Sequence, residues 1–493
     1  MTTTVMPLLG APSTSSSWDA IDWRTIEKDV LRLQMRIAKA TREGCWGKVK
    51  ALQWLLTHSS SAKLLAVRRV VRNPGRHTAG VDGIIWRTSS QKLLAARSLQ
   101  RRGYCPQPLR RLYIAKKNGK LRALGIPTLG DRAQQALHLL ALEPVAETLA
   151  DPNAYGFRPK RSTADAIEQC FKALARKHSA QWIFEGDIKA CFDRISHPWL
   201  IDHIPMDKFI LRKWLAAGYM EEGVVYPTEA GTPQGGIASP VLANLALDGL
   251  EEAAQRAVPR HQKVNVVKYA DDFIITGASK EVLETKVKPA VVAFLGERGL
   301  ELSEEKTHIT HIDDGFGFLG FNVRKYGGKL LIKPSKQAVK RFLDDIRRLI
   351  RANTAAKTEE LIRQLNSKIR GWANYFGHVV AKKTFNYVDH QVIRALIAWI
   401  NRRHPNKSVR WKQQKYLRSE GHRNWVFFAT IRDGLGRVTF LDLFRASSVP
   451  ITRHIKIQAN ATPYDPAFTD YFTRRAQSRR VSRLAWRGMV ALA

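Results

Sequence analysis

Hydrophobic residues along this chain recur with two periods, and each period predicts a different element. Apolar positions three and four residues apart, interleaved with lysine and arginine, run from Trp18 to about Val71 and predict basic amphipathic helices. Helical spacing returns in later segments, at residues 131–149, 162–177, 238–250, 280–298, 334–352, 358–376 and 385–402. The chain is therefore expected to be rich in helix, and its last three predicted helices follow one another directly.

Short apolar and β-branched runs predict strands between these helices. The run at 181–187 ends on an aspartate, and the run at 266–275 is interrupted by Asp271 and Asp272. This second pattern predicts a hairpin of two buried strands with both carboxylates at or near the turn. Asn118-Gly119 between two apolar runs predicts another hairpin.

The adjacent carboxylates at 271–272 are the first candidate chemical group. Asp-Asp also occurs at 313–314 and 344–345, and the last of these pairs fits a solvated helix face. Only the 271–272 pair has a strand pattern on both sides. Two like charges at the end of buried strands are unfavourable unless a cation neutralises them, and oxygen ligands favour magnesium over zinc. This setting alone leaves the metal site open, and Asp187 after the earlier strand is a candidate third carboxylate.

Cations crowd the tip of the hairpin at 109–122. Lys116, Lys117, Lys120 and Arg122 have no carboxylate near them in the sequence. The tip is therefore either a solvated basic loop or a clamp for the oxygens of a triphosphate or of a phosphate backbone.

Gln234 lies in a loop with a proline and two glycines, Thr232-Pro233-Gln234-Gly235-Gly236. Glycine permits close backbone approach to a bulky ligand, and the Gln234 amide both donates and accepts hydrogen bonds. The alternative is a simple connection from a strand to a helix.

The charge balance indicates the class of partner. The chain carries 81 Lys and Arg against 43 Asp and Glu, a formal net charge of +38. Self-repulsion of this size is extreme for an enzyme of small substrates and is tolerable when nucleic acid neutralises it. Candidate contacts come from the first helices and the tail, namely Arg68, Arg69, Arg474, Arg475, Arg479 and Arg480. The alternatives are ordinary helix packing for the first two and a disordered arm for the others.

Membrane and disulfide-rich classes are excluded by what the sequence lacks. No apolar run approaches transmembrane length, and the N-terminus lacks the basic-then-apolar order of a secretory signal. The four cysteines form no Cys-x-x-Cys pair, which supports neither a zinc knuckle nor a disulfide framework. We therefore expect a cytoplasmic protein, in a bacterial cytoplasm or at the nucleoid, with an organelle as the alternative.

Taken together and in this order, the motifs of the chain resemble those of group II intron-encoded reverse transcriptases, also called maturases. The resemblance extends from about Trp18 to about Phe472. Its motifs are Gly80-Val81-Asp82-Gly83, the Lys116–Arg122 hairpin with Leu124-Gly125-Ile126-Pro127, Tyr155-Gly156-Phe157-Arg158, Glu185-Gly186-Asp187-Ile188, Thr232-Pro233-Gln234-Gly235-Gly236, Tyr269-Ala270-Asp271-Asp272, Leu302-Ser303-Glu304-Glu305-Lys306, Phe318-Leu319-Gly320-Phe321 and Ile369-Arg370-Gly371-Trp372-Ala373-Asn374-Tyr375.

The resemblance implies an α+β fold of the right-hand polymerase type, in which fingers and palm with an antiparallel sheet precede an α-helical thumb. The implied domains are a disordered N-terminus at 1–17, a basic helical N-terminal extension of the fingers at 18–105, fingers and palm at 106–325, a helical thumb or maturase X domain at 326–405, and a basic, DNA-binding-like C-terminal region at 406–493. Many relatives continue into a Cys-rich HNH-type endonuclease domain. Such cysteines do not occur before Ala493, so second-strand cleavage by this chain is not expected.

The resemblance also implies that Asp187, Asp271 and Asp272 hold two Mg²⁺ ions. In phosphoryl transfer, one metal activates the primer 3′-hydroxyl and the other steadies the pyrophosphate. Three carboxylates around two dications would remove the burial problem of the Asp271-Asp272 pair.

Further residues are implied to surround the incoming deoxynucleoside triphosphate, namely Lys116, Arg122, Phe192, Gln234, Tyr269 and Ala270. Lys116 and Arg122 would grip the triphosphate, and Gln234 would line the pocket. Phe192, five residues after Asp187, would exclude a 2′-hydroxyl by steric contact.

The implied function is an RNA-directed DNA polymerase that also binds its own intron RNA to assist splicing. It would copy that RNA into cDNA during retrohoming, with intron RNA, a DNA target or primer and deoxynucleoside triphosphates as partners. Two alternatives are an RNA-binding splicing factor with a vestigial polymerase and a related reverse transcriptase recruited to defence. The sequence leaves the oligomeric state open.

Overall fold

The computed structural model describes residues 17–478 apart from 116–118, 120, 234, 422, 433 and 435. Contacts between residues divide the chain into two compact units. Unit 1 comprises Met1–Ala166, Phe184–Ile309 and Ile457–Arg483, and unit 2 comprises Ile167–Ile183, Thr310–Lys456 and Leu484–Ala493. The chain therefore leaves unit 1 and returns to it near its C-terminal end.

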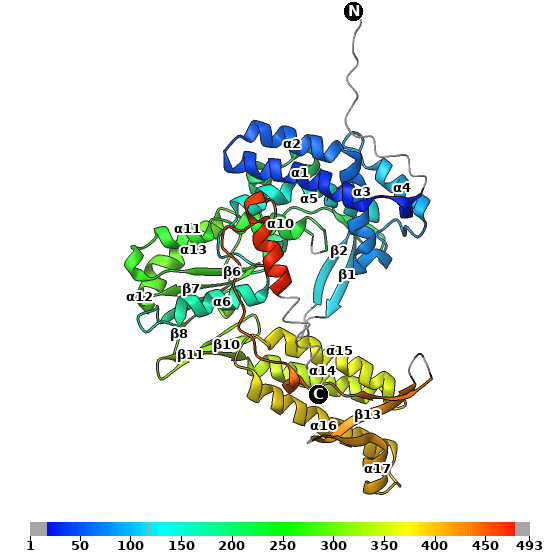
Figure 1. Cartoon of the computed structure of the whole chain (residues 1–493). Helices are drawn as coiled ribbons and strands as arrows, with labels where there is room; N and C mark the ends of the chain where they lie inside the picture. The colour runs from blue at the N-terminus through cyan, green and yellow to red at the C-terminus, as the bar shows by residue number, and fades with distance from the viewer. Residues whose placement is uncertain are drawn as a thin grey trace, which may run out of the picture. The chain divides into compact units, whose positions relative to one another are not determined.

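The N-terminal helices of unit 1 pack around α5 (Leu129–Leu149), as Figure 1 shows. Almost every residue of α5 is buried, because apolar and small side chains occupy all of its sides. The helices around it are α1 (Trp23–Arg42), α2 (Trp46–His58) and α3 (Ser60–Arg72), with α4 (Ser89–Ser98) against α3. The helices predicted from Trp18 to Val71 are confirmed, and their apolar faces are buried against α5.

A first sheet of unit 1 has the strand order β2-β1-β4-β5. Its hairpin joins β1 (Leu109–Ala115) to β2 (Leu121–Ile126), with Ala115 opposite Leu121. This hairpin is the one that the Asn118-Gly119 pair predicted. The sequence did not predict β4 (Tyr219–Glu221) and β5 (Val224–Tyr226), which extend the sheet through a parallel pairing of β4 with β1.

A second sheet carries the acidic residues and has the strand order β6-β7-β3-β8. Its strands are β3 (Trp182–Asp187), β6 (Val266–Tyr269), β7 (Asp272–Gly277) and β8 (His308–His311). The hairpin predicted at 266–275 is confirmed as the antiparallel pair β6–β7. Strand β7 is buried along its length after Asp272, which fixes the hairpin in the core of the unit.

Helices pack beside this second sheet and connect its strands. They are α6 (Thr163–Leu174), α7 (Cys191–Arg194), α8 (His197–His203), α9 (Lys208–Leu215), α10 (Ser239–Leu247), α11 (Leu250–Arg256), α12 (Lys280–Val282) and α13 (Lys288–Gly296). Figure 1 shows α11 and α13 next to β6 and β7. The single helix predicted at 280–298 is interrupted by a π-helical turn at Leu283–Val287.

Unit 2 begins its main segment with a small sheet and a group of long helices. The strand order is β11-β10-β9, formed by β9 (Phe316–Phe318), β10 (Phe321–Tyr326) and β11 (Lys329–Pro334). The helices α14 (Lys336–Ala352), α15 (Thr358–Phe376) and α16 (Lys382–Arg403) confirm the three consecutive helices predicted from the apolar spacing. Phe376 and Trp399 are buried, so these aromatic rings belong to the core.

Further along unit 2, α17 (Val409–Tyr416) leads into a sheet that the sequence did not predict. Its strand order is β12-β13-β14, with β12 (Leu417–Glu420), β13 (Arg423–Arg432) and β14 (Val438–Asp442). Strand β13 packs on α15. The region beyond residue 406 is therefore partly a folded extension of the helical group.

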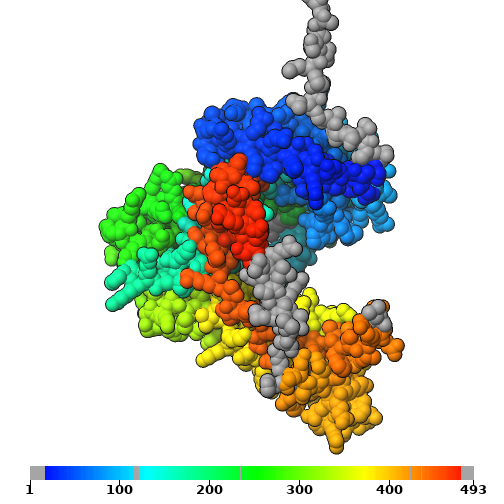
Figure 2. Space-filling view, viewed as in Figure 1, coloured from blue at the N-terminus to red at the C-terminus, as the bar shows by residue number. Residues whose placement is uncertain are grey.

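The C-terminal segment that returns to unit 1 lies on its N-terminal helices, as Figure 2 shows for the red and blue surfaces. Arg42 of α1 forms an ion pair of 2.8 Å with Asp465, and the Tyr464 hydroxyl donates to Glu143 of α5 over 3.0 Å. These contacts join the two ends of the chain within one unit. No helix of the described residues is long and apolar enough to cross a membrane.

Candidate active site

The turn between β6 and β7 presents the adjacent aspartates. Tyr269 pairs with Asp272 across the hairpin, which leaves Ala270 and Asp271 as a two-residue turn. Ala270 has φ = 58°, as tight hairpin turns require. A residue with a Cβ is strained in this conformation, so the surrounding structure must hold it there.

Gly156 supplies that support from the opposite side of the turn. A Cβ at Gly156 would lie 2.3 Å from the backbone nitrogen of Ala270, so only glycine permits this close approach. The backbone N–H of Tyr155 donates to the Lys268 carbonyl over 2.9 Å. Arg158 holds the same loop in place through a bidentate contact with Glu147, at 2.8 and 3.0 Å. The loop that contains the Tyr155–Arg158 motif therefore fixes the turn that carries Asp271.

Lys268 on β6 holds the hairpin in place through buried polar contacts. Its ammonium group is buried and forms ion pairs of 3.0 Å with both Asp151 and Asp248. It also donates to the Leu247 carbonyl over 2.5 Å. Burial alone would lower the pKa of Lys268, but the negative charges of Asp248 and Asp151 raise it above the ordinary value. The contacts of the Lys268 ammonium group thus join the strand that leads into the turn to the end of α10.

Gly186 places Asp187 beside the turn. A Cβ at Gly186 would lie 2.2 Å from Cζ of Phe273, so the aromatic ring packs directly on the backbone of β3. Because β3 pairs with β7 in the sheet, Asp187 at the end of β3 comes close to Asp271 and Asp272. The structure therefore brings together the three carboxylates that the sequence singled out.

The three carboxylates repel one another. Burial, followed by the charge of Asp187, raises the pKa of Asp271. Although part of Asp272 faces solvent, desolvation of its carboxylate and then the charges of Asp271 and Asp187 raise its pKa to about 6. The Lys306 ammonium lies 2.7 Å from an oxygen of Asp187 and supplies a countercharge. This ion pair raises the pKa of Lys306 above its ordinary value.

These residues fit a divalent cation by their chemistry. Within the described residues, no three His, Cys, Asp or Glu side chains are arranged as a ready metal cluster. The candidate donors are nevertheless all carboxylate oxygens, which Mg²⁺ prefers. Burial is the largest cause of the raised pKa values of Asp271 and Asp272, and a bound cation would offset this cost of holding their charges. The Lys306 ammonium group is the positive charge that contacts Asp187 in this structure.

Two aromatic residues, Phe157 and Phe192, belong to motifs that flank the carboxylates in the sequence. Phe192 is on α7, which begins after Ala190 at φ = 49°. The Phe192 ring meets the Phe157 ring edge to face, with centroids 6.3 Å apart. The Phe192 carbonyl also accepts a hydrogen bond of 2.6 Å from the backbone N–H of Thr232. The motifs around Phe157, Phe192 and Thr232 are thus neighbours in space.

The structure describes part of the expected triphosphate clamp. Arg122 lies on β2 opposite Ile114 and is exposed, and its positive charge lowers the pKa of Asp271 slightly against the larger effect of burial. Lys116 and Gln234 lie outside the described residues. Tyr269 is half-buried, and burial raises the pKa of its hydroxyl.

The candidate nucleic-acid contacts differ in their surroundings. Arg68 contacts Glu27 and lies 4.3 Å from the centre of the Trp23 ring, and Arg69 lies 3.2 Å from Glu143. Arg475 forms an ion pair of 2.9 Å with the buried Asp165. Arg474 is exposed, whereas Arg479 and Arg480 lie outside the described residues. Intramolecular ion pairs therefore give Arg68, Arg69 and Arg475 a structural role in addition to any contact with phosphate.

The sequence alone did not indicate the structural roles of Lys268, Lys306 and Gly156. Lys268 stood as a lone charge in a buried strand, which itself signals a buried ion pair. Lys306 ends the motif at 302–306, but no local pattern indicates that it meets Asp187. The motif at 155–158 gives no local reason for its glycine, because the Ala270 backbone that Gly156 contacts is far away in the sequence.

The comparisons with protein families agree with this geometry. The reverse transcriptase (RNA-dependent DNA polymerase) model matches residues 114–323, which include all the acidic residues of the site. The model of the N-terminal domain of reverse transcriptase matches residues 18–99. The group II intron, maturase-specific domain model matches residues 339–417, from α14 to α17.

Comparison with individual proteins also finds a relative encoded by a group II intron. Group II intron-encoded protein LtrA of Lactococcus lactis subsp. cremoris is 30% identical over 439 residues, covering 69% of this chain and 72% of that protein. Protein YkfC of Escherichia coli (strain K12) is 32% identical over 340 residues, covering 60% of this chain and 87% of that protein. An uncharacterized 91 kDa protein in the cob intron of Schizosaccharomyces pombe is 28% identical over 418 residues, covering 67% and 51%. The chain therefore belongs to the family of group II intron-encoded reverse transcriptases and maturases.

Proposed function

We propose that Asp187, Asp271 and Asp272 are the catalytic carboxylates of this reverse transcriptase and that they hold Mg²⁺. The observation that supports this proposal is geometric: β3 lies beside β7 in the sheet, which puts Asp187 next to the β6–β7 turn that carries Asp271 and Asp272. When bound, the metal would lower the charge of the attacking 3′-oxygen and of the departing pyrophosphate. The protein's own part is to hold the carboxylates, and the contacts of Gly156, Gly186 and Lys268 do so.

The incoming nucleotide would lie over the same turn. Arg122 would pair with the triphosphate, which a guanidinium recognises through its planar set of donors. Phe192 would lie against the sugar, where its ring leaves no space for a 2′-hydroxyl. Lys116, Gln234, Tyr269 and Ala270 complete the proposed nucleotide site, the first two on the basis of the sequence motif.

The remaining parts of the chain would serve RNA binding. We assign residues 18–105 to an extension of the fingers, 106–325 to fingers and palm, 326–405 to the thumb, and 406–493 to a basic nucleic-acid-binding region. Intron RNA, a DNA target or primer and deoxynucleoside triphosphates are the proposed partners. Splicing assistance would depend on the segment that matches the maturase-specific domain, 339–417.

Primer extension on an RNA template with Mg²⁺ tests the catalytic assignment. Asp271→Asn should abolish cDNA synthesis, because an amide cannot neutralise a dication, while RNA binding stays close to wild type. Asp314→Asn is the matched control, since Asp314 belongs to another Asp-Asp pair and is exposed. Polymerisation by the Asp271→Asn protein would reject the assignment. Absence of cDNA from folded wild-type protein would instead favour a splicing factor with a vestigial polymerase.

A further inference from the structure

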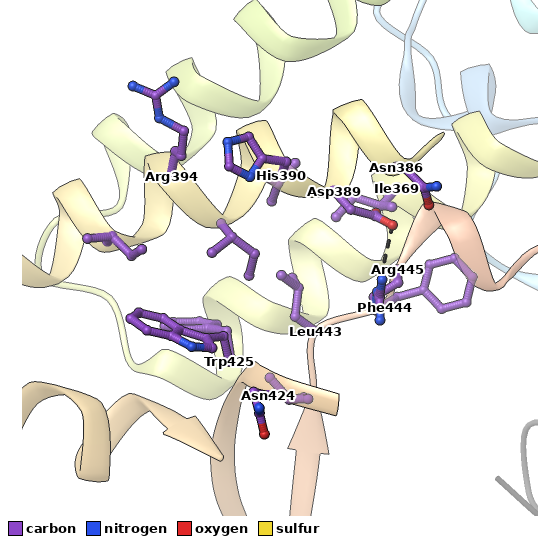
Figure 3. A pocket seen from close by; sticks show the side chains of 15 residues that line it. Ile369, Asn386, Asp389, His390, Arg394, Asn424, Trp425, Leu443, Phe444 and Arg445 are labelled. Atoms are coloured by element: carbon purple, nitrogen blue, oxygen red, sulfur yellow. Dashed lines mark ion pairs between the residues drawn. The ribbon is translucent and has the colours of Figure 1, made fainter. Parts of the chain in front are cut away.

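Two hollows in unit 2 lie on either side of α16 and share one residue, Arg394. The first hollow has a volume of about 450 Å³ and is enclosed by α15, α16, the strand β13 and the segment 443–445 that follows β14 (Figure 3). Its floor is apolar and includes Ile369, Phe427 and Leu443, which are buried. The volume and the apolar lining suit one planar group, and the hollow is too small for a folded partner.

Trp425 forms one wall of this first hollow through an irregularity in β13. Arg418 pairs with Val426 and Glu420 with Arg423, so Asn424 and Trp425 together stand opposite Ser419 alone. This is a β-bulge, a device that redirects a side chain at functional sites. Trp425 has φ = 65°, a strained conformation for a bulky residue, and its side chain remains 51% exposed. The protein thus holds an indole at the mouth of an apolar hollow in spite of the strain.

The polar groups around the first hollow carry little negative charge. Asp389 is its acidic residue among the described lining, and its carboxylate accepts hydrogen bonds from the backbone N–H groups of Ala446 and Ser447 at 2.7 and 3.0 Å. Figure 3 shows the Asp389–Arg445 ion pair, which measures 3.8 Å. The negative charge of Asp389 is therefore offset by groups of the protein itself. The other charged residues that line the first hollow are arginines.

The second hollow lies between α14 and α16 and has a volume of about 410 Å³. Four arginines contribute to it, and its described lining contains no carboxylate, with Arg347, Arg351, Arg394 and Arg402 as the basic residues. Ala395 and Ala398 on α16 keep the groove open at its floor. In Figure 3 the Arg394 guanidinium points away from Trp425, consistent with its place in this second groove.

We propose that these two hollows together hold an unpaired nucleotide of an RNA, with its base against Trp425 and its neighbouring phosphates in the arginine groove. Single-stranded RNA joins flat, stackable bases to anionic phosphates, and α16 offers a matching surface for each. Arg347 pairs with Asp344 at 3.2 Å, and a peptide would leave the other three arginines of the groove without a counterpart unless it were acidic. The proposal rests on the proposed function because the hollows lie largely within the segment that matches the maturase-specific domain.

Binding of a labelled, unstructured RNA oligonucleotide to the full chain tests the base pocket. Trp425→Leu should weaken binding about tenfold, whereas Trp425→Phe should stay within about twofold, because only a π-face stacks on a base. A blunt RNA duplex of the same length should show no difference between these variants. Equal affinities for wild type and Trp425→Leu, or equal losses for the Leu and Phe variants, would overturn the proposal.

A matched pair of arginines tests the phosphate groove. Arg351 and Arg348 lie on the same helix, but only Arg351 lines the groove, and Arg348 pairs with Asp345 at 3.4 Å. Arg351→Gln should reduce the slope of log affinity against log salt by about 0.7, the value for one phosphate of a single strand, and Arg348→Gln should not. Equal changes in the two slopes would show that the net charge alone decides and would contradict the groove.

Cross-linking keeps the proposal testable if Trp425→Leu fails to fold. The same oligonucleotide with 4-thiouridine should cross-link to residues 424–427 of the wild-type protein on irradiation, as mapped by mass spectrometry. Cross-links confined to other segments, or stronger protection by the corresponding DNA oligonucleotide, would reject an RNA site here. The Asp271→Asn protein should give the same cross-links, so that failure of the pocket is distinguished from failure of the polymerase assignment.

Discussion

Phe192 is the side chain that we propose selects the sugar of the incoming nucleotide. Its ring meets the Phe157 ring edge to face, and its backbone carbonyl accepts the hydrogen bond from Thr232, so both the side chain and the backbone of Phe192 have fixed neighbours. Phe192→Ala should therefore raise ribonucleotide incorporation about tenfold or more relative to deoxyribonucleotides, since selection by shape depends on the volume of the excluding group. Single-nucleotide extension on an RNA template measures this ratio.

The control for Phe192 is an aromatic residue away from the site. Phe209→Ala removes an exposed ring on α9 and should leave sugar selectivity at the wild-type value. Unchanged selectivity in the Phe192→Ala protein would reject the steric role.

A second prediction for a single residue concerns the effect of His138 on the pH dependence of stability. It is buried in α5 against Trp214, and burial lowers its pKa to about 4. The unfolded chain binds a proton at this residue near pH 6.5, so between pH 6.5 and 4 the unfolded state takes up more protons than the folded state. The contribution of His138 to stability is thus complete above pH 6.5 and falls by about 3 kcal/mol as the pH drops through 4.

Urea unfolding of wild type and His138→Gln across this pH range measures the effect. The free energy of unfolding of wild type should decrease more steeply than that of the variant below pH 6.5. His261→Gln changes an exposed histidine and should leave the wild-type slope unaltered. Parallel curves for wild type and His138→Gln would contradict the buried, neutral state.

At the scale of elements, the sequence pattern predicted the helices and hairpins that are stabilised mainly by contacts between residues close together in the chain. The helices α14, α15 and α16 and the hairpin β6–β7 follow directly from apolar spacing and from the flanking polar residues. The hairpin β4–β5 was missed because each strand has three residues and gains its support from a distant partner, β1.

The sheet β12-β13-β14 was missed for a different reason. Strand β13 contains a run of aromatic and β-branched residues at 425–431, which is a strand signal, but the high charge of the region led to its treatment as a basic tail. Within the candidate site, the sequence identified the carboxylates and could not identify the Lys306 contact with Asp187, because the two residues are 119 positions apart. Long-range pairings of this kind depend on the assembled fold.

Gly186 provides a test of how the elements of the acidic sheet fit together. Because a Cβ at this position would overlap the Phe273 ring, Gly186→Ala should lower the free energy of unfolding by about 1–3 kcal/mol. Phe273→Leu introduced together with Gly186→Ala should cost less than the sum of the two single changes, since the smaller side chain makes room. Thermal and urea unfolding measure the four proteins of this cycle.

The control for this cycle is another glycine without such a neighbour. Gly296, at the end of α13, has no atom within 4 Å of an added Cβ, so Gly296→Ala should change stability little. Simple additivity of Gly186→Ala and Phe273→Leu would show that the ring does not depend on the glycine.

At the scale of the whole molecule, the excess of basic residues is distributed through both units. In unit 1, some of the basic residues form intramolecular ion pairs, such as Arg158–Glu147 and Arg475–Asp165. In unit 2, Arg351, Arg394 and Arg402 have no ion-pair partner among the described residues and line a groove. The net charge therefore overstates the number of cations that are free to meet phosphates, and a measured salt dependence would report that smaller number.

RNA affinity should still fall steeply with salt, because neutralised phosphates release their counterions. If about six phosphates of a single strand are contacted, affinity should fall by a hundredfold or more between roughly 50 and 200 mM salt. Filter binding or fluorescence anisotropy of an unstructured RNA over this range gives the slope, and the slope gives the number of contacts. An oligonucleotide with an uncharged methylphosphonate backbone should bind more weakly at low salt and show almost no salt dependence. Nearly flat curves for both oligonucleotides would mean that the +38 charge does not act through phosphate contacts.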